Sequence, residues 1–385
     1  MEYLQIGIPF IRQNGNRTQL IAKITESDKP SYELWYETSE EYGKYFVSDR
    51  IDAFLVALLP YAMQNRLDII SDSTVSEKLE LQISKFLMPI LSKYSDIYNE
   101  ITISVKNKSD ININSEKCYA TGFSRGVDSF DTIKDALECG EQSLTHLTFF
   151  NVGSHRSTCN YTKEQSIQLY NDRLKTAREA SKIFNLPLVD VNSNLGEHLT
   201  LSYVKIHHFC SFSAVLAMQK FFKNYYYSSG YSIDNFSIKK CDKGSAFYEP
   251  LLSALLSTES TTFYITGLNK TRLDKIKSIS EFEPSYNNLN VCYYEDKNCG
   301  KCEKCVRTQL ELMSIDKLNL YKKSFDIEEF ERTKNKRSMV YMLKHQNQSN
   351  YSEILDQMKL SGIKLPFSLK IQKFVYGIAL KILKK

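Results

Sequence analysis

The chain has 385 residues, of which 42% are hydrophobic and 25% are charged. This composition is that of an ordinary globular protein, so it excludes disordered, collagen-like and fibrous classes. Fifty Lys and Arg residues against 45 Asp and Glu residues leave a net charge of +5, which is too small over this length to predict nucleic-acid binding by itself. At roughly 150 residues per domain, the length predicts roughly two to three domains.

The N-terminal residues carry neither the basic start nor the apolar run of a secretion signal, and no segment approaches the apolar length of a membrane-spanning helix. The sequence therefore favours a cytoplasmic protein. Disulfides are not expected in that compartment.

The first part of the chain, residues 1–117, predicts a small α+β domain of unknown role. The elements expected in it are strands at 3–8, 18–24 and 32–36, followed by helical segments at 51–59 and 75–92.

From Cys118 to about residue 265, strand-like and helical segments alternate. Such alternation predicts an α/β domain with a parallel sheet and helices on both faces. Ligands of such sheets bind at the carboxyl ends of the strands. The expected strands are 118–123, 144–152, 186–191 and 225–227, and the expected helices are 129–139, 167–184 and 203–223.

Residues 311–385 are interpreted as a helical, increasingly basic tail. Between Lys364 and Lys385 there are six lysines and no acidic residue, with apolar residues at helical spacing. A basic amphipathic helix of this kind fits either weak contact with an anionic membrane surface or docking on the protein's own body.

The segment Ser124-Arg125-Gly126-Val127-Asp128-Ser129 stands at the first strand-to-helix junction. Small residues let the backbone approach an anion, a helix N-terminus supplies unpaired N–H groups, and two hydroxyls add donors. The segment therefore predicts a phosphate-binding loop, although a plain polar turn is the alternative. It is neither the P-loop of kinases and GTPases nor the Gly-x-Gly-x-x-Gly loop of dehydrogenases.

Four cysteines, Cys292, Cys299, Cys302 and Cys305, follow a C-x6-C-x2-C-x2-C spacing. Four thiolates without a histidine fit a closed, tetrahedral Zn²⁺ site. An iron–sulfur cluster takes the same ligand set, and scattered reduced cysteines are the third interpretation. The other cysteines are expected to be buried small residues: Cys118, Cys139, Cys159, Cys210 and Cys241.

The loop at 124–129 resembles the Ser-Gly-Gly-x-Asp-Ser loop of the ATP pyrophosphatase (PP-loop) superfamily, which cleaves ATP between its α and β phosphates. With the cysteine spacing at 292–305, it resembles the 7-cyano-7-deazaguanine synthase branch of that superfamily. The resemblance covers about residues 118–310. It implies an adenine nucleotide alpha hydrolase-like (HUP) domain there, beside the N-terminal domain and the tail.

The resemblance implies an ATP-dependent ligase that releases AMP and pyrophosphate and uses ATP, Mg²⁺ and Zn²⁺. Its partners would be a small carboxylic acid and a nitrogen donor. In it, Ser124, Gly126 and Ser129 would hold pyrophosphate, and Asp128 would organise the loop or a magnesium ion. The residues implied in nucleotide binding are Ser124, Arg125, Gly126, Val127, Asp128, Ser129, Asn151 and Gly153, with Asp128 and Ser129 implied in catalysis.

The sequence departs from the family pattern at three places. Arg125 replaces the family's second glycine: at positive φ an arginine would be strained there, whereas at an ordinary φ its guanidinium could strengthen phosphate binding. The pair His207-His208 replaces an Arg-Asn pair and fits either a structural or a catalytic role. Residues 241–250 replace the substrate loop. Further candidates for phosphate or carboxylate contacts are Lys243, Lys270 and Arg272.

Two other functions stay open from the sequence. A tRNA-modifying PP-loop enzyme would need free catalytic cysteines and a basic groove for RNA. A non-catalytic nucleotide-binding or interaction module is favoured by Arg125 and by the missing substrate loop. The sequence carries no strong nucleic-acid signal, and we consider a homodimer as the assembly.

Overall fold

The computed structural model of the protein describes residues 2–138, 144–155, 161–333, 342, 345 and 348–363. The chain divides into two compact units. The first unit takes in Met1–Ser124 and Asp135–Asn269, and the second takes in Arg125–Lys134 and Lys270–Lys385.

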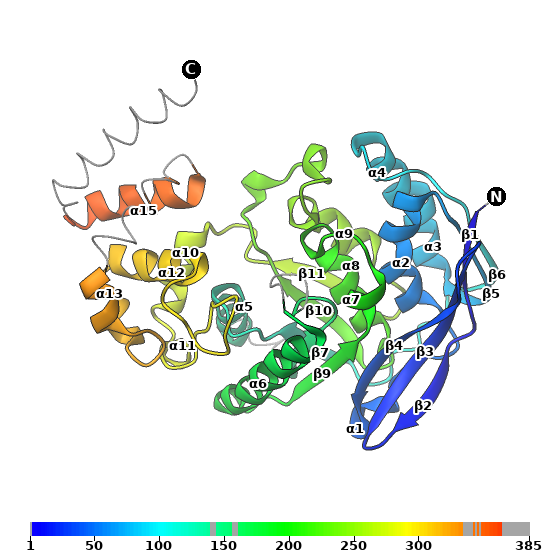
Figure 1. The fold of residues 1–385 in the computed structure, drawn as a ribbon, viewed down its shortest axis with the longest axis horizontal. Helices are drawn as coiled ribbons and strands as arrows, with labels where there is room; N and C mark the ends of the chain where they lie inside the picture. Colours follow the sequence, from blue (N-terminus) through cyan, green and yellow to red (C-terminus); the bar gives the residue numbers. More distant parts are fainter. Residues whose placement is uncertain are drawn as a thin grey trace. The chain divides into compact units, whose positions relative to one another are not determined.

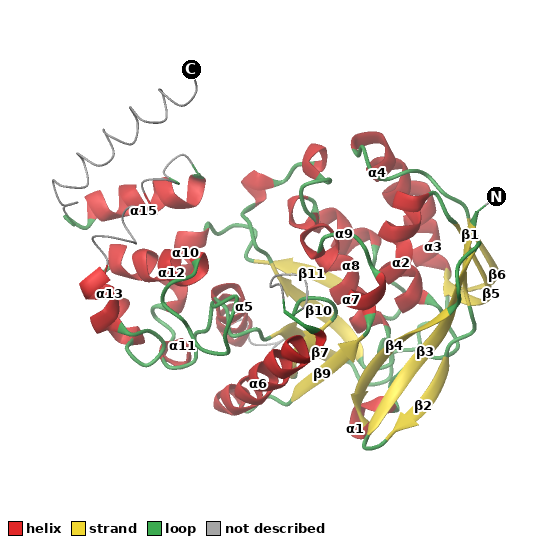
Figure 2. Ribbon diagram, viewed as in Figure 1, coloured by secondary structure: helices red, strands yellow, loops and turns green. Residues whose placement is uncertain are grey.

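The strands of the first unit join in one sheet (Figure 2). Among the described residues this sheet is 11-stranded, with the order β11-β10-β7-β8-β9-β4-β3-β1-β5-β6 and with β2 paired to β3. In chain order the strands are β1 (Tyr3–Ile6), β2 (Phe10–Asn14), β3 (Arg17–Glu26), β4 (Tyr32–Ser39), β5 (Asp68–Ser76), β6 (Ile103–Ser109), β7 (Cys118–Gly122), β8 (His146–Asn151), β9 (Leu188–Ser193), β10 (Phe222–Ser228) and β11 (Thr262–Thr266).

The strands from β7 to β11 pair in parallel, which confirms the expected α/β architecture with a large, mostly parallel sheet. The second and third of these strands lie on one side of β7, whereas the fourth and fifth lie on the other. The direction of winding therefore reverses between β7 and β10. In open α/β sheets, this reversal marks the place where ligands bind, at the carboxyl ends of the strands.

Helices cover this sheet (Figure 1). α6 packs on β8 and β9, and α2 packs against α8. From Asp52 to Met63, α2 is buried at every residue, which is typical of a helix enclosed in a core. The helices of the first unit are α1 (Glu40–Gly43), α2 (Asp52–Asn65), α3 (Glu77–Gln82), α4 (Met88–Tyr94), α6 (Lys163–Ser181), α7 (Leu195–His198), α8 (Tyr203–Leu216) and α9 (Glu249–Leu255).

The N-terminal strands join the parallel strands through the antiparallel pair β4 and β9. Asp190, a buried residue of β9, accepts hydrogen bonds from Arg17 at 2.7 Å and from Arg178 at 2.5 Å. The hydroxyl of Thr38 donates to the carbonyl of the same aspartate at 2.8 Å. The backbone pairing of β4 with β9 and the hydrogen bonds to buried Asp190 therefore join the N-terminal strands to the parallel strands in one sheet.

The second unit is helical in its described part. It contains the first part of α5 (Val127–Glu138) and the helices that follow residue 270. These are α10 (Arg272–Ile279), α11 (Glu283–Tyr286), α12 (Glu303–Ser314), α13 (Ile327–Thr333) and α15 (Ser349–Leu360).

The two units divide the chain differently from the three expected domains. Residues 1–117 share one sheet with the segment after them, because β4 pairs with β9. Residues 270–310, which we expected in the nucleotide domain, group with the residues after 310. The basic segment 364–385, for which membrane contact was considered, lies outside the described residues.

Candidate metal centre and anion-binding loop

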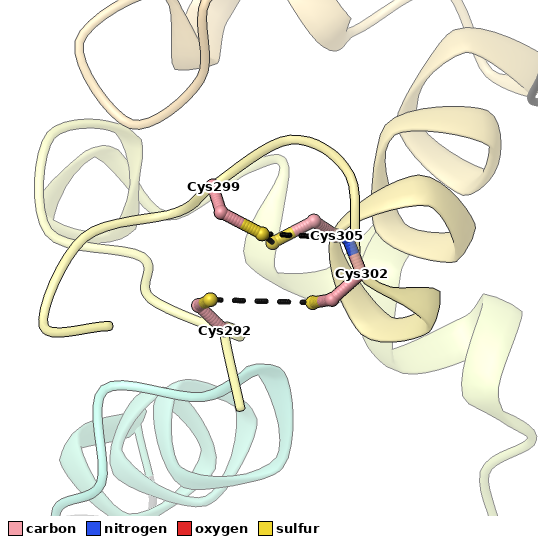
Figure 3. A group of neighbouring side chains, drawn as sticks. All are labelled: Cys292, Cys299, Cys302 and Cys305. Atoms are coloured by element: carbon pink, nitrogen blue, oxygen red, sulfur yellow. Dashed lines mark hydrogen bonds between the residues drawn. The ribbon is translucent and has the colours of Figure 1, made fainter. Parts of the chain in front are cut away.

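The four cysteines of the predicted metal site come together in the second unit (Figure 3). Their sulfur atoms all lie within 4.8 Å of one another. The sulfurs of Cys299 and Cys305 are 4.0 Å apart, as are those of Cys292 and Cys302. Four sulfurs bound tetrahedrally at about 2.3 Å from a zinc ion would be about 3.8 Å apart. The cluster could therefore hold a metal ion such as zinc.

The spacing favours a single ion over the iron–sulfur alternative. A cluster of several irons and sulfides occupies more volume than one ion, so its cysteines must stand farther apart. The third interpretation, scattered cysteines, is wrong, because all four sulfurs lie within 4.8 Å of one another.

Local structure explains how the chain brings the sulfurs together. Gly300 has a φ of 66°, a left-handed conformation that suits glycine in the turn between Cys299 and Cys302. Cys302 stands immediately before α12, and Cys305 lies in its first turn. The backbone N–H groups of Lys301 and Cys302 point to the sulfur of Cys299, at 3.5 and 3.3 Å. Such donors stabilise a thiolate.

Asn298 holds the loop that carries the cysteines. Its side-chain oxygen accepts a hydrogen bond from the backbone of Val291 at 2.8 Å. Its amide nitrogen donates to the carbonyls of Leu289 at 2.8 Å and Ser324 at 2.9 Å. The loop therefore has a defined conformation around the sulfurs.

The packed sulfurs also influence one another's protonation. Hydrogen bonding with the sulfurs of Cys292 and Cys305 lowers the pKa of Cys302 to about 3, and the same coupling raises the pKa of Cys305. Metal binding requires the thiolate form of each ligand.

The predicted phosphate loop lies at the start of α5. Ser124 is exposed and belongs to the first unit, and the following residues belong to the second. The hydroxyl of Ser129 donates to the carbonyl of Gly126 at 2.9 Å, and the backbone N–H of Phe130 donates to the same carbonyl at 3.1 Å. Val127 is buried as the first residue of the helix. The loop therefore passes directly into the first turn of α5.

Arg125 has a φ of 61°, which settles the question left open by the sequence. The backbone adopts the left-handed conformation that a glycine would adopt without strain. The guanidinium is buried and donates to the backbone carbonyl of Asp296, at 2.8 Å. In turn, the backbone N–H of Asn290 donates to the carbonyl of Arg125 at 2.9 Å. Arg125 therefore contacts the loop that carries the cysteines.

Asp128 in the first turn of α5 is paired with two cations. Its carboxylate oxygens lie 3.4 Å from a guanidinium nitrogen of Arg272 and 3.3 Å from the ammonium nitrogen of Lys275. Burial by itself raises the pKa of this carboxyl, but Arg272 and Lys275 lower it by more, so the net shift is downward. Asp128 is thus ionised, with its charge balanced inside the second unit.

Arg272 also pairs with a second acid, the buried Glu311 of α12. Its carboxylate oxygens lie 3.3 Å from Arg272 and 3.5 Å from Arg307. Burial raises the pKa of Glu311, although both arginines act against it. Lys270, another candidate from the sequence, pairs with Asp131 of α5 at 2.8 Å. These contacts hold the start of α5 on α10 and α12.

Asn151 is the last residue of β8 in the first unit, and Gly153 lies just after the strand. β7 and β8 pair in parallel, so their carboxyl ends meet at the same edge of the sheet. The amide nitrogen of Asn151 donates to the side chain of Asn192 at 2.8 Å. Gly153 has a φ of 99°, and a Cβ atom there would lie 3.4 Å from the ring of Tyr203. A glycine is therefore needed at this position.

A buried polar network surrounds His208 in the first unit, and it was not predicted from the sequence. His208 is fully buried, with Ser245 at 2.8 Å from Nδ1 and Glu249 at 2.9 Å from Nε2. Ser229 donates a hydrogen bond to the other oxygen of Glu249. Burial lowers the pKa of His208 to about 3, so the imidazole is neutral. His208 therefore fits the structural role, one of the two roles that the sequence left open for the histidine pair. Its partners Ser245 and Glu249 lie in segment 241–250, and the departure of that segment from the family pattern was the one sequence signal for them.

The remaining cysteines that the structure describes, Cys118, Cys210 and Cys241, are free and buried, as expected. Cys139 and Cys159 lie outside the described residues. No helix in the described parts of the chain combines the length and apolar character required to cross a bilayer.

Comparison with known proteins does not extend these observations. No protein-family model matches the chain, nor does any curated protein or solved structure. The function of the protein is therefore inferred from the residues and geometry of this chain alone.

Proposed function

We propose that the protein is an ATP-dependent adenylating enzyme of the PP-loop type, with an adenine nucleotide alpha hydrolase-like sheet. The observation that carries the proposal is the position of the loop. It follows β7, which is the first of the parallel strands and borders the reversal of winding beside β10. This is the position where α/β sheets bind ligands.

The residues of the loop suit an anion. Ser124 places a hydroxyl at an exposed position of the loop, the hydroxyl of Ser129 supports the turn by donating to the carbonyl of Gly126, and the N-terminus of a helix favours negative charge. Asp128 is neutralised by Arg272 and Lys275, so its charge does not repel a phosphate group. In this proposal Asp128 organises the loop.

The proposed reaction has two steps. An oxygen of a small carboxylic acid attacks the α-phosphorus of ATP, the bond to pyrophosphate breaks, and an acyl-adenylate forms. A nitrogen nucleophile then attacks the acyl carbon, loses a proton and displaces AMP. Donors in the loop stabilise the charge on the departing pyrophosphate, and bound Mg²⁺ would neutralise part of the phosphate charge. The cysteine cluster with Zn²⁺ has a structural role.

Calorimetry with ATP and Mg²⁺ on zinc-loaded protein tests nucleotide binding. We expect Ser124→Ala to lose affinity by about threefold to tenfold, since it removes one hydrogen-bond donor. Ser129→Ala should also weaken binding, because it removes the hydroxyl that supports the turn at Gly126. The matched control is Ser202→Ala, at an exposed serine whose side chain makes no helix-capping bond. The absence of ATP binding at millimolar concentration would refute the proposal.

Product analysis tests the chemistry. With small carboxylic acids and an amine or ammonia, the enzyme should form AMP and pyrophosphate. Formation of ADP and phosphate instead would show a different bond cleavage and would exclude adenylation.

A non-catalytic nucleotide-binding module is the second candidate, and Arg125 favours it. Its guanidinium reaches Asp296, so it does not add the phosphate contact considered from the sequence. This candidate predicts ATP binding without pyrophosphate release for any acid tested. A tRNA-modifying enzyme is disfavoured, since the described cysteines outside the metal cluster are buried and so do not offer an accessible catalytic thiol.

A further inference from the structure

Two hydrogen bonds join the predicted anion-binding loop to the segment that carries the cysteines. The guanidinium of Arg125 donates to the carbonyl of Asp296 at 2.8 Å, and the N–H of Asn290 donates to the carbonyl of Arg125 at 2.9 Å. Both partners lie close in the chain to metal-ligand candidates, because Asn290 is two residues before Cys292 and Asp296 is three residues before Cys299. Arg125 is therefore held through both its backbone carbonyl and its side chain.

Hydrogen bonds between side chains and backbone also stabilise the segment 290–298 internally. The side chain of Asn290 donates to the same carbonyl of Asp296 and accepts from the backbone N–H of Cys292 at 3.0 Å. Asn298 closes the segment by accepting from the backbone of Val291. Because Cys292 lies near the start of this segment and Cys299 directly follows it, a metal that draws their sulfurs together also fixes the carbonyl that receives Arg125.

The backbone at Arg125 needs such support. A left-handed conformation is unfavourable for an arginine, and it persists where surrounding contacts determine it. The hydrogen bonds to Asp296 and Asn290 are these contacts. When they are lost, the loop can relax to an ordinary φ.

We propose that Arg125 is a positioning residue that couples occupancy of the cysteine site to the conformation of the loop at residues 125–129. With metal bound, the segment 290–298 is ordered and holds Arg125 in its left-handed conformation. Without metal, the segment loosens and the first turn of α5 opens. The coupling does not depend on ATP, although its effect on nucleotide affinity rests on the proposed function.

Hydrogen exchange of the full-length, zinc-loaded protein tests the coupling through the amides of residues 126–134. The key variant is Arg125→Asn, because asparagine tolerates positive φ but is too short to reach Asp296. We expect exchange at these amides to rise about tenfold, the factor produced by loss of one or two hydrogen bonds. Arg125→Lys keeps a donor and should restore part of the protection. Lys297→Ala, which removes an exposed charge from the same segment, should leave exchange unchanged.

Metal affinity supplies the second measurement, with zinc and a competing chelator as the probe. Coupling is reciprocal, so Arg125→Asn should weaken zinc binding by the same factor by which it loosens the loop. Unchanged exchange at 126–134 in Arg125→Asn would overturn the proposal. So would loss of protection throughout α12, because Arg125 would then support the whole unit.

The outcomes separate this inference from the proposed function. A protein that shows the exchange effect but binds no ATP retains the coupling and refutes the nucleotide site. A protein that binds ATP equally well with and without zinc, with equal exchange at 126–134, retains the nucleotide site and refutes the coupling.

Discussion

Two aspartates in the first turns of helices show how partners decide the behaviour of a carboxyl group. Asp52 begins α2 in the first unit and accepts hydrogen bonds from the backbone of Ser76 at 2.8 Å and from Gln219 at 2.7 Å. Asp128 in α5 of the second unit faces Arg272 and Lys275.

The two carboxyl groups titrate in opposite directions. Burial raises the pKa of Asp52 to about 6, because neutral donors offset only part of the cost of removing its charge from water. The cations beside Asp128 outweigh burial and lower its pKa. The comparison teaches that hydrogen-bond donors offset only part of the cost of burying a carboxylate, whereas two adjacent cations outweigh that cost.

Removal of the metal should produce the largest difference in stability between the two units. A structural zinc site contributes on the order of 10 kcal/mol to the folding of the segment that binds it. We therefore expect a strong chelator or Cys302→Ser to abolish cooperative unfolding of the second unit, measured by hydrogen exchange in α12. Trp35, the single tryptophan, lies in β4 and reports the first unit by fluorescence, which should unfold as before.

Cys118→Ala is the matched control for that experiment, since it removes a buried cysteine outside the cluster. It should keep one zinc ion per chain. Unchanged exchange in α12 after complete zinc loss would show that the cluster does not support the fold.

The pH dependence of stability distinguishes the two aspartates directly. A raised pKa in the folded state means that stability is fully present below the unfolded pKa and is lost as pH rises through the folded pKa. For Asp52, whose pKa rises from the ordinary 3.8 to about 6 in the folded state, the first unit should lose about 2 kcal/mol between pH 4 and pH 6. Urea unfolding followed by Trp35 fluorescence measures this slope.

Asp52→Asn should remove that slope, because asparagine does not titrate in this range. A wild-type slope of opposite sign between pH 4 and pH 6, still present in the variant, would contradict the assignment to Asp52.

Arg272 is the shared partner of Asp128 and Glu311, so its removal tests the electrostatics of the second unit. Arg272→Met leaves the fully buried Glu311 with Arg307 alone. We expect a loss of about 2 kcal/mol in the stability of this unit, measured by denaturant dependence of hydrogen exchange in α12.

Arg272→Lys should recover part of that loss, since one ammonium cannot reproduce all contacts of a guanidinium. Arg332→Met removes an exposed arginine that pairs with Glu329, and it should leave the unit unchanged. Equal effects of the two methionine variants would show that burial does not strengthen the pairs of Arg272.

Asp128→Asn should have the smallest effect on stability. Its side chain is 34% exposed, so solvent screening reduces the contribution of its ion pairs to about 0.5–1 kcal/mol at neutral pH. A lowered pKa means that this stability is present above the unfolded pKa and is lost as pH falls through the folded pKa. The difference between variant and wild type should therefore vanish in acid, by the same exchange measurement.

Local patterns predicted much of the fold. The strands expected at 118–123, 144–152 and 186–191 match β7, β8 and β9 within a few residues, and the helix expected at 167–184 matches α6. The helix expected at 203–223 ends at Leu216, because the chain turns at residues 217–221 and enters β10 at Phe222. The sequence analysis missed β2, β5, β6 and β11. β2 is exposed at every residue, so it lacks the alternation by which strands are found.

The sequence by itself determined the cysteine cluster, the loop before α5 and the alternation of strands and helices, because these depend on residues close together in the chain. Only the tertiary structure decided the partners of Asp128, which are separated from it by 144 and 147 residues. It also decided the left-handed backbone of Arg125 and the pairing of β4 with β9. Such contacts depend on how distant segments pack, and no local pattern specifies which distant residue will supply a cation, a carbonyl or a strand edge.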